Sequence, residues 1–336
     1  MTNITNAITE PTFEHHLDDG WARRMLIDDV RRGLSRRPLR LPPRWLYDER
    51  GSELFDQITR LAEYYPTEAE RSILQREARS IASITQADTL IELGSGTSDK
   101  THTLIQAFRE TGRLERFVPF DVSEKTLRDA AAELVERYPG LDVHGIIGDF
   151  TLHLSKLPTD GVPIVAFLGS TIGNLYAEER HAFLAMLGEH LPPGAWLLLG
   201  IDLLKPIERL VQAYDDPHGV TAEFSRNVLH VLNRELGADF DVEKFDHIAL
   251  WDPHQTRMDL RLRANGDHHV RIPDADVELE LYDGEEIRVE ISTKFRIPNI
   301  AADVADAGFD IRQIWTDQPG DVALALASVP RRSLSE

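Results

Sequence analysis

A short apolar segment that ends in two glycines constrains this chain more than any other feature. The segment Thr89–Leu93 has enough apolar and β-favouring residues for a buried strand, and Gly94 and Gly96 follow it directly. Beyond the turn, residues at the spacing of one helix face predict a helix at about 99–110: Thr101, Leu104, Ile105 and Phe108. Glycines let a ligand approach the backbone, and the first amides of a helix attract negative or electron-rich groups. The pattern therefore predicts a site for a nucleotide-like ligand.

Two nucleotide-binding motifs are incomplete in this sequence, which limits the kinds of ligand that the turn could bind. A dinucleotide fingerprint needs a third glycine where this chain has Asp99, and no Gly-Lys-Ser/Thr triplet completes a phosphate-binding loop. A pyrophosphate, and with it a nicotinamide oxidoreductase, is disfavoured. Glu92 before the turn and Asp121 at the end of the next strand suit a cationic nucleoside, because ribose hydroxyls donate hydrogen bonds and a sulfonium is positive. A purely structural turn is the alternative.

Composition excludes several classes of protein. Among 336 residues, 37 Lys and Arg face 57 Asp and Glu, and the formal charge of −20 disfavours contact with nucleic acid or anionic membranes. There is no cysteine, so disulfides, thiolate nucleophiles and cysteine metal sites are absent. The histidine pairs at 15–16 and 268–269 have no third ligand spaced with them, which argues against a metal. No apolar run spans a bilayer, and we expect a cytoplasmic protein.

Helices and strands alternate regularly through the middle of the chain. Strands are expected at Thr89–Leu93, 117–120, Asp142–Ile147, 163–168 and 195–199, with helices at 99–110, 124–137 and 178–191. This order predicts a parallel sheet with helical crossovers, in which ligands bind beyond the carboxyl ends of the strands. Four residues that suit a polar ligand follow those ends: Gly94, Asp121, Asp149 and Asn174.

The pattern changes after residue 203. Alternating apolar residues at 258–262, the turn Asn265-Gly266 and a returning strand from Val270 predict an antiparallel hairpin. A second alternation at 289–293 places Glu290 and Ser292 together on the opposite face of a strand. Strands at 311–315 and 322–327 would complete a seven-stranded sheet, and these last two strands would form a hairpin.

Several motifs carry a resemblance to a known family. Glu92-Leu-Gly-Ser-Gly96, Asp121 and Gly148-Asp-Phe150 resemble a class I S-adenosylmethionine (SAM)-dependent methyltransferase. The chain more closely resembles the histidine Nα-methyltransferases of ergothioneine biosynthesis, over about residues 20–328. Six further motifs carry that resemblance: Leu41-Pro-Pro-Arg-Trp-Leu-Tyr-Asp48, Leu54-Phe-Asp-Gln-Ile-Thr-Arg-Leu61, Glu63-Tyr-Tyr-Pro-Thr67, Phe167-Leu-Gly-Ser-Thr-Ile-Gly-Asn-Leu175, Ala213-Tyr-Asp-Asp216 and Glu290-Ile-Ser-Thr-Lys-Phe295.

The resemblance implies an architecture and a reaction. The fold would be α/β, with a Rossmann-like class I methyltransferase sheet of seven strands and a discontinuous α+β substrate-binding domain. Residues 1–17 would be a flexible tail, 18–66 and 204–294 the substrate-binding domain, and 67–203 and 295–330 the SAM-binding domain. The reaction would be trimethylation of the α-amine of L-histidine to hercynine by a monomer, with SAM as methyl donor and no metal.

The resemblance also implies a role for individual residues. SAM would contact Gly94, Lys100, Asp121, Asp149 and Phe150. Asn174 and Tyr214 would bind the substrate carboxylate, while the imidazole would meet Tyr64, Glu290 and Ser292. Tyr47, Phe55 and Gly169 would surround the amine, and the catalytic residues would be Tyr47, Gly169 and Asn174. Leu260 would line the substrate pocket at a position that is commonly methionine in the family, which leaves histidine selectivity open.

Elementary chemistry favours the same assignment of residues to the methyl donor and to the substrate. Methyl transfer from a sulfonium needs alignment and exclusion of water rather than a nucleophilic side chain. Glu290 and Ser292 offer an acceptor and a donor to the two imidazole nitrogens, which an indole cannot use in full. Whether Tyr47 accepts the proton or orients a water stays open. Two alternatives remain, namely a methyltransferase of the same fold that acts on another amino acid such as tryptophan, and a non-catalytic nucleoside-binding protein.

Overall fold

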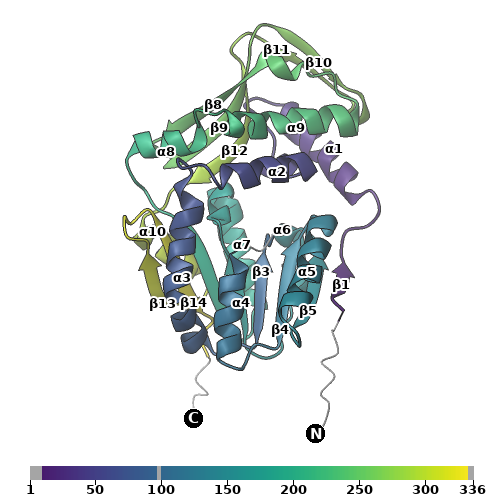
Figure 1. Ribbon diagram of the computed structural model, residues 1–336. Coiled ribbons are helices and arrows are strands. Elements are labelled where there is room, and N and C mark those ends of the chain that lie inside the picture. The colour runs from purple at the N-terminus through teal and green to yellow at the C-terminus, as the bar shows by residue number, and fades with distance from the viewer. Residues whose placement is uncertain (1–9, 97–99, 332–336) are drawn as a thin grey trace.

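The computed structural model describes residues 10–96 and 100–331, and the chain forms two stacked parts (Figure 1). The lower part is built on one large sheet with the strand order β1-β5-β4-β3-β6-β7-β14-β13. Its strands are β1 (Thr12–His15), β3 (Thr89–Leu93), β4 (Arg116–Asp121), β5 (Asp142–Ile147), β6 (Pro163–Phe167), β7 (Trp196–Asp202), β13 (Asp310–Thr316) and β14 (Val322–Ser328). Strands β1 and β3–β7 run parallel, whereas β14 is antiparallel to β7 and to β13. The predicted parallel sheet with a terminal antiparallel hairpin is confirmed.

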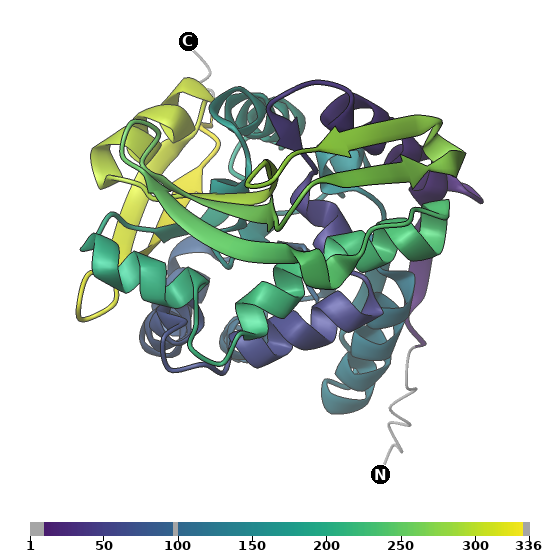
Figure 2. The ribbon, with the colours of Figure 1, turned by 90° about the horizontal axis from the view of Figure 1, so that it is seen from above.

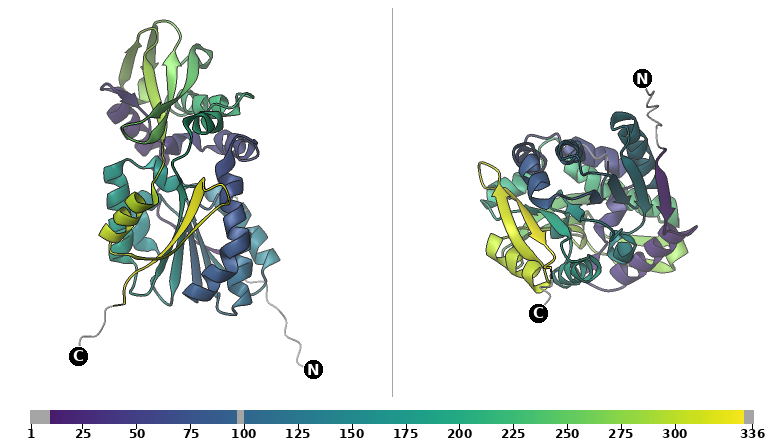
Figure 3. Two further views of the ribbon diagram at one scale, coloured as in Figure 1. Left: turned by 90° about the vertical axis from the view of Figure 1, so that its left-hand side faces the viewer. Right: turned by 90° about the horizontal axis from the view of Figure 1, so that it is seen from below.

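Helices cover both faces of this sheet (Figure 3). The lower part contains α3 (Tyr65–Thr85), α4 (Thr101–Glu110), α5 (Glu124–Arg137), α6 (Phe150–His153), η2 (Leu154–Lys156), η3 (Thr171–Asn174), α7 (Ala177–His190) and α10 (Ile297–Asp306). Side chains of α3, α4 and α5 pack in one apolar core, and those of α7 and α10 pack in a second. The sheet separates the two cores, which is the doubly wound arrangement expected from the sequence. The expected first residues of the helix at 99–110 lie partly outside the described residues.

The expected tail and the strand count need a correction. Residues Thr12–His15 form an eighth strand, β1, which pairs in parallel with residues 144–147 of β5. Phe13 lies under the guanidinium of Arg128 at 4.2 Å, and its ring lies next to Gly145, where a Cβ would meet the ring at 2.7 Å. The segment is short and polar, so its sequence carries no strand pattern. The exposed edge of β5 supplies the hydrogen-bonding partners that make it a strand.

The upper part is a mostly antiparallel sheet flanked by helices, in which only the short strand β2 runs parallel to its neighbour β12 (Figures 1 and 2). Its four-stranded sheet has the order β2-β12-β9-β8, and β10 and β11 form a separate pair. The strands are β2 (Leu39–Arg40), β8 (Phe245–Asp252), β9 (Arg257–Ala264), β10 (His268–Ile272), β11 (Val277–Leu281) and β12 (Glu286–Thr293). The helices are α1 (Trp21–Leu34), η1 (Pro43–Leu46), α2 (Glu49–Ile58), α8 (Ile207–Tyr214), α9 (Val220–Leu236), η4 (Val242–Lys244) and η5 (Pro273–Ala275).

The predicted hairpin around Asn265-Gly266 is wrong. Strand β9 pairs with β8 on one side and with β12 on the other, so both of its edges are occupied. The following strand β10 pairs with β11 instead. A turn sequence fixes the local bend, but the free edges of the neighbouring strands decide which pairs form.

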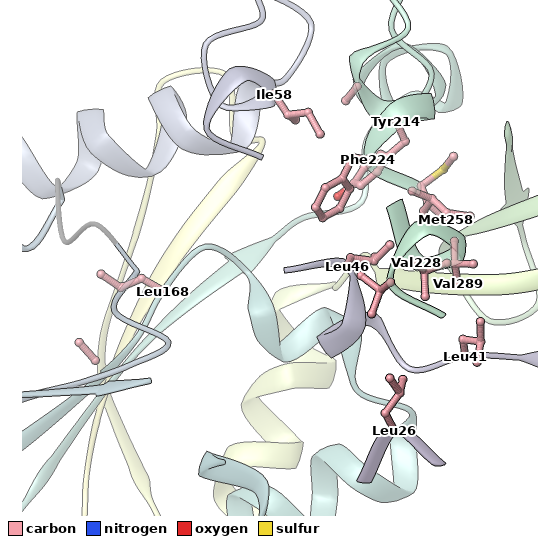
Figure 4. Close-up of a cluster of buried hydrophobic side chains, with 14 of the residues drawn as sticks. Leu26, Leu41, Leu46, Ile58, Leu168, Tyr214, Phe224, Val228, Met258 and Val289 are labelled. Carbon is pink, nitrogen blue, oxygen red and sulfur yellow. The ribbon is translucent and has the colours of Figure 1, made fainter. Parts of the chain in front are cut away.

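One apolar core joins α9 to the four-stranded sheet. Phe224 and Val228 of α9 face Met258 and Val289 of the sheet, and Leu46 of η1 lies beside them (Figure 4). This packing holds β12 over the carboxyl ends of the large sheet (Figure 1). The division into a SAM-binding and a substrate-binding domain stays a prediction.

Candidate active site

The glycine turn after β3 is built as the sequence predicted. Gly94 and Gly96 both have left-handed backbones, with φ of 69° and 49°. The Gly94 amide donates to the carbonyl of Phe120 at 2.8 Å, and the Gly96 amide donates to the Asp121 carboxylate at 3.1 Å. The turn is therefore tied to the end of β4, and a side chain at either glycine would strain the backbone.

Space and charge at this turn fit a nucleoside. Among the described residues, a Cβ added to Gly96 would meet no atom within 4 Å, and one added to Gly94 would meet only the Phe150 ring, at 3.9 Å. Burial raises the pKa of Asp121, and backbone amides of Ser123, Gly96 and Val122 oppose the rise. Each oxygen of this carboxylate can still accept a hydrogen bond from a ribose hydroxyl. The residues present thus fit SAM.

Glu92 has a different surrounding from the one expected. Its side chain is buried and accepts a hydrogen bond from the Thr101 hydroxyl at the start of α4. Burial raises the pKa of this carboxyl group to about 8, so Glu92 is largely neutral at pH 7. It joins β3 to α4 and brings little charge to a cofactor.

Lys100 lies at the same turn and is paired with a residue that the sequence analysis missed. Its Nζ is 2.5 Å from Glu70 Oε2, and the Glu70 carboxylate also accepts the Gly169 amide at 2.9 and 3.1 Å. Glu70 is 1% exposed although it lies on the apolar face of α3, with Ile73 and Leu74 one turn further on. A carboxylate on an apolar helix face is the signal that could have pointed to Glu70.

Gly94 and Gly169 flank the point where the sheet reverses its strand order. Strands β3 and β6 are neighbours, but their successors lie on opposite sides, at β4 and β7. Both glycines are exposed, and Gly169 and Ser170 have φ of 73° and 57°. In sheets of this kind, ligands bind at such a switch point.

Asp149 and Phe150 follow β5 on the other side of the turn. One oxygen of Asp149 accepts the amide and hydroxyl of Thr151, at 2.8 and 2.6 Å. The other oxygen is bound by Arg44, which comes from η1 of the upper part. Arg44 belongs to the motif at 41–48, but its sequence neighbours gave no sign of this contact. Phe150 packs edge-on against the ring of Phe167 at 5.3 Å.

Strand β12 brings the expected imidazole-binding residues together. Asn174 Nδ2 donates to Glu290 Oε1 at 3.1 Å, and the hydroxyls of Tyr214 and Ser292 are 2.9 Å apart. Leu260 lies opposite Glu290 on β9 and is 1% exposed. The carboxyl end of β6, one end of α8 and the inner face of β12 therefore meet at one place.

Aromatic rings surround this place. Tyr47 is 5.4 Å from Phe55, Phe55 is 6.2 Å from Tyr64, and Tyr64 is 6.1 Å from Tyr214, all edge-on. Phe224 of α9 completes the group at 5.2 Å from Tyr47. Its position on a buried helix face gave no functional signal in the sequence.

Burial controls the ionisation of the site. It raises the pKa of the Tyr47, Tyr64 and Tyr214 hydroxyls well above the ordinary value, so these groups are neutral at pH 7. Burial raises the pKa of Glu290 to about 7, against the charge of Lys294 and the hydrogen bond from Asn174. Glu290 can therefore be protonated or ionised near neutral pH.

A buried ion cluster lies directly behind Tyr214 and Ser292. Asp202 accepts hydrogen bonds from Lys294, Lys205 and Tyr65, and all four side chains are almost inaccessible. Burial acts to raise the pKa of Asp202, but the two ammonium groups outweigh it and the pKa is lowered. This cluster was not predicted from the sequence, although Lys294 continues the alternation of Glu290 and Ser292.

Two expected absences concern only the described residues. In the ranges 10–96 and 100–331, no group of three His, Cys, Asp or Glu side chains is placed to hold a metal ion. Within these same ranges, no helix has the length and apolar character needed to cross a membrane.

Comparisons with known proteins agree with this geometry. Residues 26–329 match the family model described as histidine-specific, SAM-dependent methyltransferase. The chain is 50% identical to the histidine N-alpha-methyltransferase of Mycolicibacterium smegmatis, over 91% of this chain and 95% of that one. It is 49% identical to the protein of the same name from Mycobacterium tuberculosis, over 94% and 98%. With ergothioneine biosynthesis protein 1 of Schizosaccharomyces pombe it shares 34% identity, over 63% of this chain and 29% of that protein. The chain therefore belongs to the family of histidine-specific, SAM-dependent methyltransferases.

Proposed function

We propose that this protein transfers three methyl groups from SAM to the α-amine of L-histidine, which gives hercynine for ergothioneine biosynthesis. One observation carries the proposal. Glu290 and Ser292 stand side by side on β12, Asn174 bonds the first, and Tyr214 bonds the second. A carboxyl and a hydroxyl group at this spacing suit the two nitrogens of an imidazole. The family match and the relatives' names support the same reaction.

The cofactor would lie at the switch point of the large sheet. The residues proposed to hold SAM are Gly94, Lys100, Asp121, Asp149 and Phe150. Bound SAM supplies a methyl group on a sulfonium, which is already activated for displacement. The chain contributes a glycine turn whose backbone a ligand can approach and the Asp121 carboxylate for the ribose. Glu92 is largely protonated, so Asp121 is the charged acceptor at this turn.

The substrate would lie between this turn and β12. We assign the substrate carboxylate to Asn174 and Tyr214, and the imidazole to Tyr64, Glu290 and Ser292. The amine would face Tyr47, Phe55 and Gly169, and Leu260 would contact the ring beside Glu290. Aromatic rings around the amine exclude water and favour a quaternary ammonium group through their electron-rich faces.

Tyr47 is proposed to orient the amine rather than to store its proton. Its pKa is raised by burial, with a smaller contribution from the nearby carboxyl group of Glu290. A neutral phenol can accept one hydrogen bond from the amine or from a water that carries the proton away. Asn174 and Gly169 would fix the amino acid so that the amine lone pair points at the methyl group.

The test is a mass-spectrometric endpoint assay with SAM and a panel of free amino acids that includes histidine and tryptophan. We expect histidine to gain three methyl groups. In Glu290→Ala, kcat/KM for histidine should fall roughly 5- to 150-fold, because a buried polar partner contributes about 1–3 kcal/mol.

A matched control lies on the same strand. Glu286 begins β12 but contacts Arg261 and Arg263, away from Asn174 and Tyr214. Glu286→Ala should therefore keep histidine kinetics close to wild type. Methylation of tryptophan with histidine ignored would reject the substrate, and tight SAM binding without turnover of any amino acid would reject the enzyme.

We further propose that the protein works as a cytoplasmic monomer on this small molecule, without nucleic acid or membrane. The charge of −20 supports this proposal. Sedimentation at micromolar concentration should give the mass of one chain.

A further inference from the structure

Two buried lysines meet at one carboxylate behind the site, and Glu290 and Asp321 lie close enough to act on them through charge. Two ammonium groups, Lys294 and Lys205, share the single carboxylate of Asp202. Lys205 also donates to Tyr65 and to the carbonyl of Leu203, whereas Lys294 donates to Tyr214 and Ser292, each at 2.7 Å. The Lys294 side chain has no exposed surface. Among the described residues, Lys294 pairs only with Asp202, which it shares with Lys205, and Glu290 is only partly ionised near pH 7. The side of the cluster that faces the site therefore favours an anion.

Hydrogen-bond donors at Lys294 are fully used. An ammonium group has three N–H donors and no acceptor, and the three contacts of Lys294 are Asp202, Tyr214 and Ser292. Both hydroxyl oxygens therefore accept from Lys294. Because these oxygens are 2.9 Å apart, one hydroxyl also donates to the other. The pair keeps a single hydrogen for a ligand.

The strongest donor is expected to meet the strongest acceptor. A phenol is a better donor than an aliphatic hydroxyl, and a hydrogen bond to a carboxylate is about twice as strong as one between neutral groups. Tyr214 then donates to the substrate carboxylate, while Ser292 donates to Tyr214 and offers only an acceptor to a ring N–H.

We propose that Lys294 is a specificity-determining positioning residue, which senses the negative charge of the substrate carboxylate through Tyr214. This inference rests on the proposed function. The cation stands one side chain behind the carboxylate, so it attracts that group without lying beside the amine, where it would oppose a trimethylammonium product. Neutral Tyr214 contacts the substrate carboxylate, and the charge of Lys294 lies behind it. This arrangement attracts the carboxylate without repelling the methylated amine.

The experiment compares histidine with histidinamide, which lacks the carboxylate charge, in wild type and in Lys294→Met. Lys294→Met should lower kcat/KM for histidine about 10- to 100-fold, mainly through KM, the range of one hydrogen bond to a charged group. Histidinamide should lose no more than about twofold, so the ratio of kcat/KM for histidine to kcat/KM for histidinamide falls about 5- to 50-fold. For each variant, the ratio of kcat/KM for histidine to kcat/KM for histidinamide is compared with the wild-type ratio. This comparison is needed because the amine of histidinamide differs in basicity from that of histidine.

Lys205→Met is the matched control. It removes the other cation from Asp202 but leaves the contacts of Lys294 with Tyr214 and Ser292 in place. It should lower thermal stability as Lys294→Met does and keep the wild-type substrate ratio. If Lys294→Met does not fold, Lys294→Gln replaces it, because glutamine keeps an N–H donor without the charge.

Outcomes separate the two proposals. A wild-type protein that methylates histidine, together with an unchanged ratio in the Lys294 variant, overturns the inference alone. An equal fall of the ratio in Lys205→Met also overturns it, because a general loss of packing would then explain the effect. A wild-type protein that ignores histidine overturns the proposed function and the inference with it.

Discussion

Glu290 shows how one side chain can be tuned by its surroundings. It lies on a strand with 9% of its surface exposed, next to the amide of Asn174 and across from the apolar side chain of Leu260. Burial disfavours the carboxylate more than Asn174 and Lys294 favour it, which brings the pKa to about 7. A carboxyl group in this state can donate to or accept from an imidazole, which itself titrates in the same range.

This raised pKa predicts a pH dependence of stability in the ligand-free protein. The pKa of Glu290 is about 7 in the folded state against 4.5 as its ordinary value, so the folded state binds more protons between these values. The free energy of unfolding should fall as pH rises through this window, by on the order of 3 kcal/mol from this group. Glu290→Gln stays neutral and should lack this part of the fall.

Urea unfolding at several pH values between 4.5 and 8 measures the difference between wild type and Glu290→Gln. The difference should be smallest at low pH, where both side chains are neutral, and should grow toward pH 8. Parallel curves at all pH values would show that Glu290 is not shifted. Glu92 titrates in both wild type and Glu290→Gln, so its contribution cancels in the difference between them.

At the scale of elements, α3 connects the cofactor turn to the turn after β6. Glu70 projects from this helix and bonds both Lys100 and the Gly169 amide. The carboxylate also fixes the left-handed backbone at Gly169, whose amide it accepts. One helix thus positions the two glycine turns that flank the switch point.

Glu70→Gln should weaken both turns together. We expect the free energy of unfolding to fall by about 2 kcal/mol or more, because a partly buried ion pair loses its charge partner. The KM for SAM and for histidine should both rise. Denaturant unfolding and steady-state kinetics measure these effects.

Glu110→Gln is the control for this prediction. Glu110 of α4 forms an exposed ion pair with Arg79 of α3. The substitution therefore removes a charge between α3 and α4 without affecting either glycine turn. Its substitution should leave the KM values unchanged. A similar rise of KM in both variants would contradict the assignment of Glu70.

At the scale of the whole molecule, polar contacts and stacked side chains join the upper part to the large sheet. Arg44 reaches from η1 to Asp149 at the end of β5 and also lies 3.7 Å from Asp29 of α1. Tyr176 lies between the guanidinium groups of Arg40 and Arg257, each 5.4 Å from its ring. The Arg44 contact touches Asp149, which is proposed to bind SAM, so cofactor and substrate binding are expected to be coupled there.

Arg44→Gln should reduce this coupling. We expect the gain in histidine affinity caused by bound S-adenosylhomocysteine to shrink by about fivefold, which corresponds to an ion pair of ~1 kcal/mol. Calorimetric titration of histidine with and without S-adenosylhomocysteine measures the gain.

Lys125→Gln is the matched control, because the exposed pair of Lys125 with Glu49 also joins the two parts. An equal loss of coupling in this variant would show that any contact between the parts has the same effect.

Sequence alone determined the elements whose signals are local. The strand and glycine turn at Thr89–Leu93, the alternation of helices and strands, and the neighbouring positions of Glu290 and Ser292 follow from periodicity and turn chemistry. The family motifs gave the site residues before any geometry was known, and their individual roles stay predictions.

Only the tertiary structure decided which distant groups meet. Strand β1 forms because β5 has a free edge, and β10 pairs with β11 because β9 has none. The partners of Lys100, Asp149 and Tyr214 lie between 30 and 105 residues away along the chain. No local pattern encodes such contacts, since burial and charge pairing depend on how the sheets stack. The charges and ionisation states of the site are therefore properties of the folded molecule.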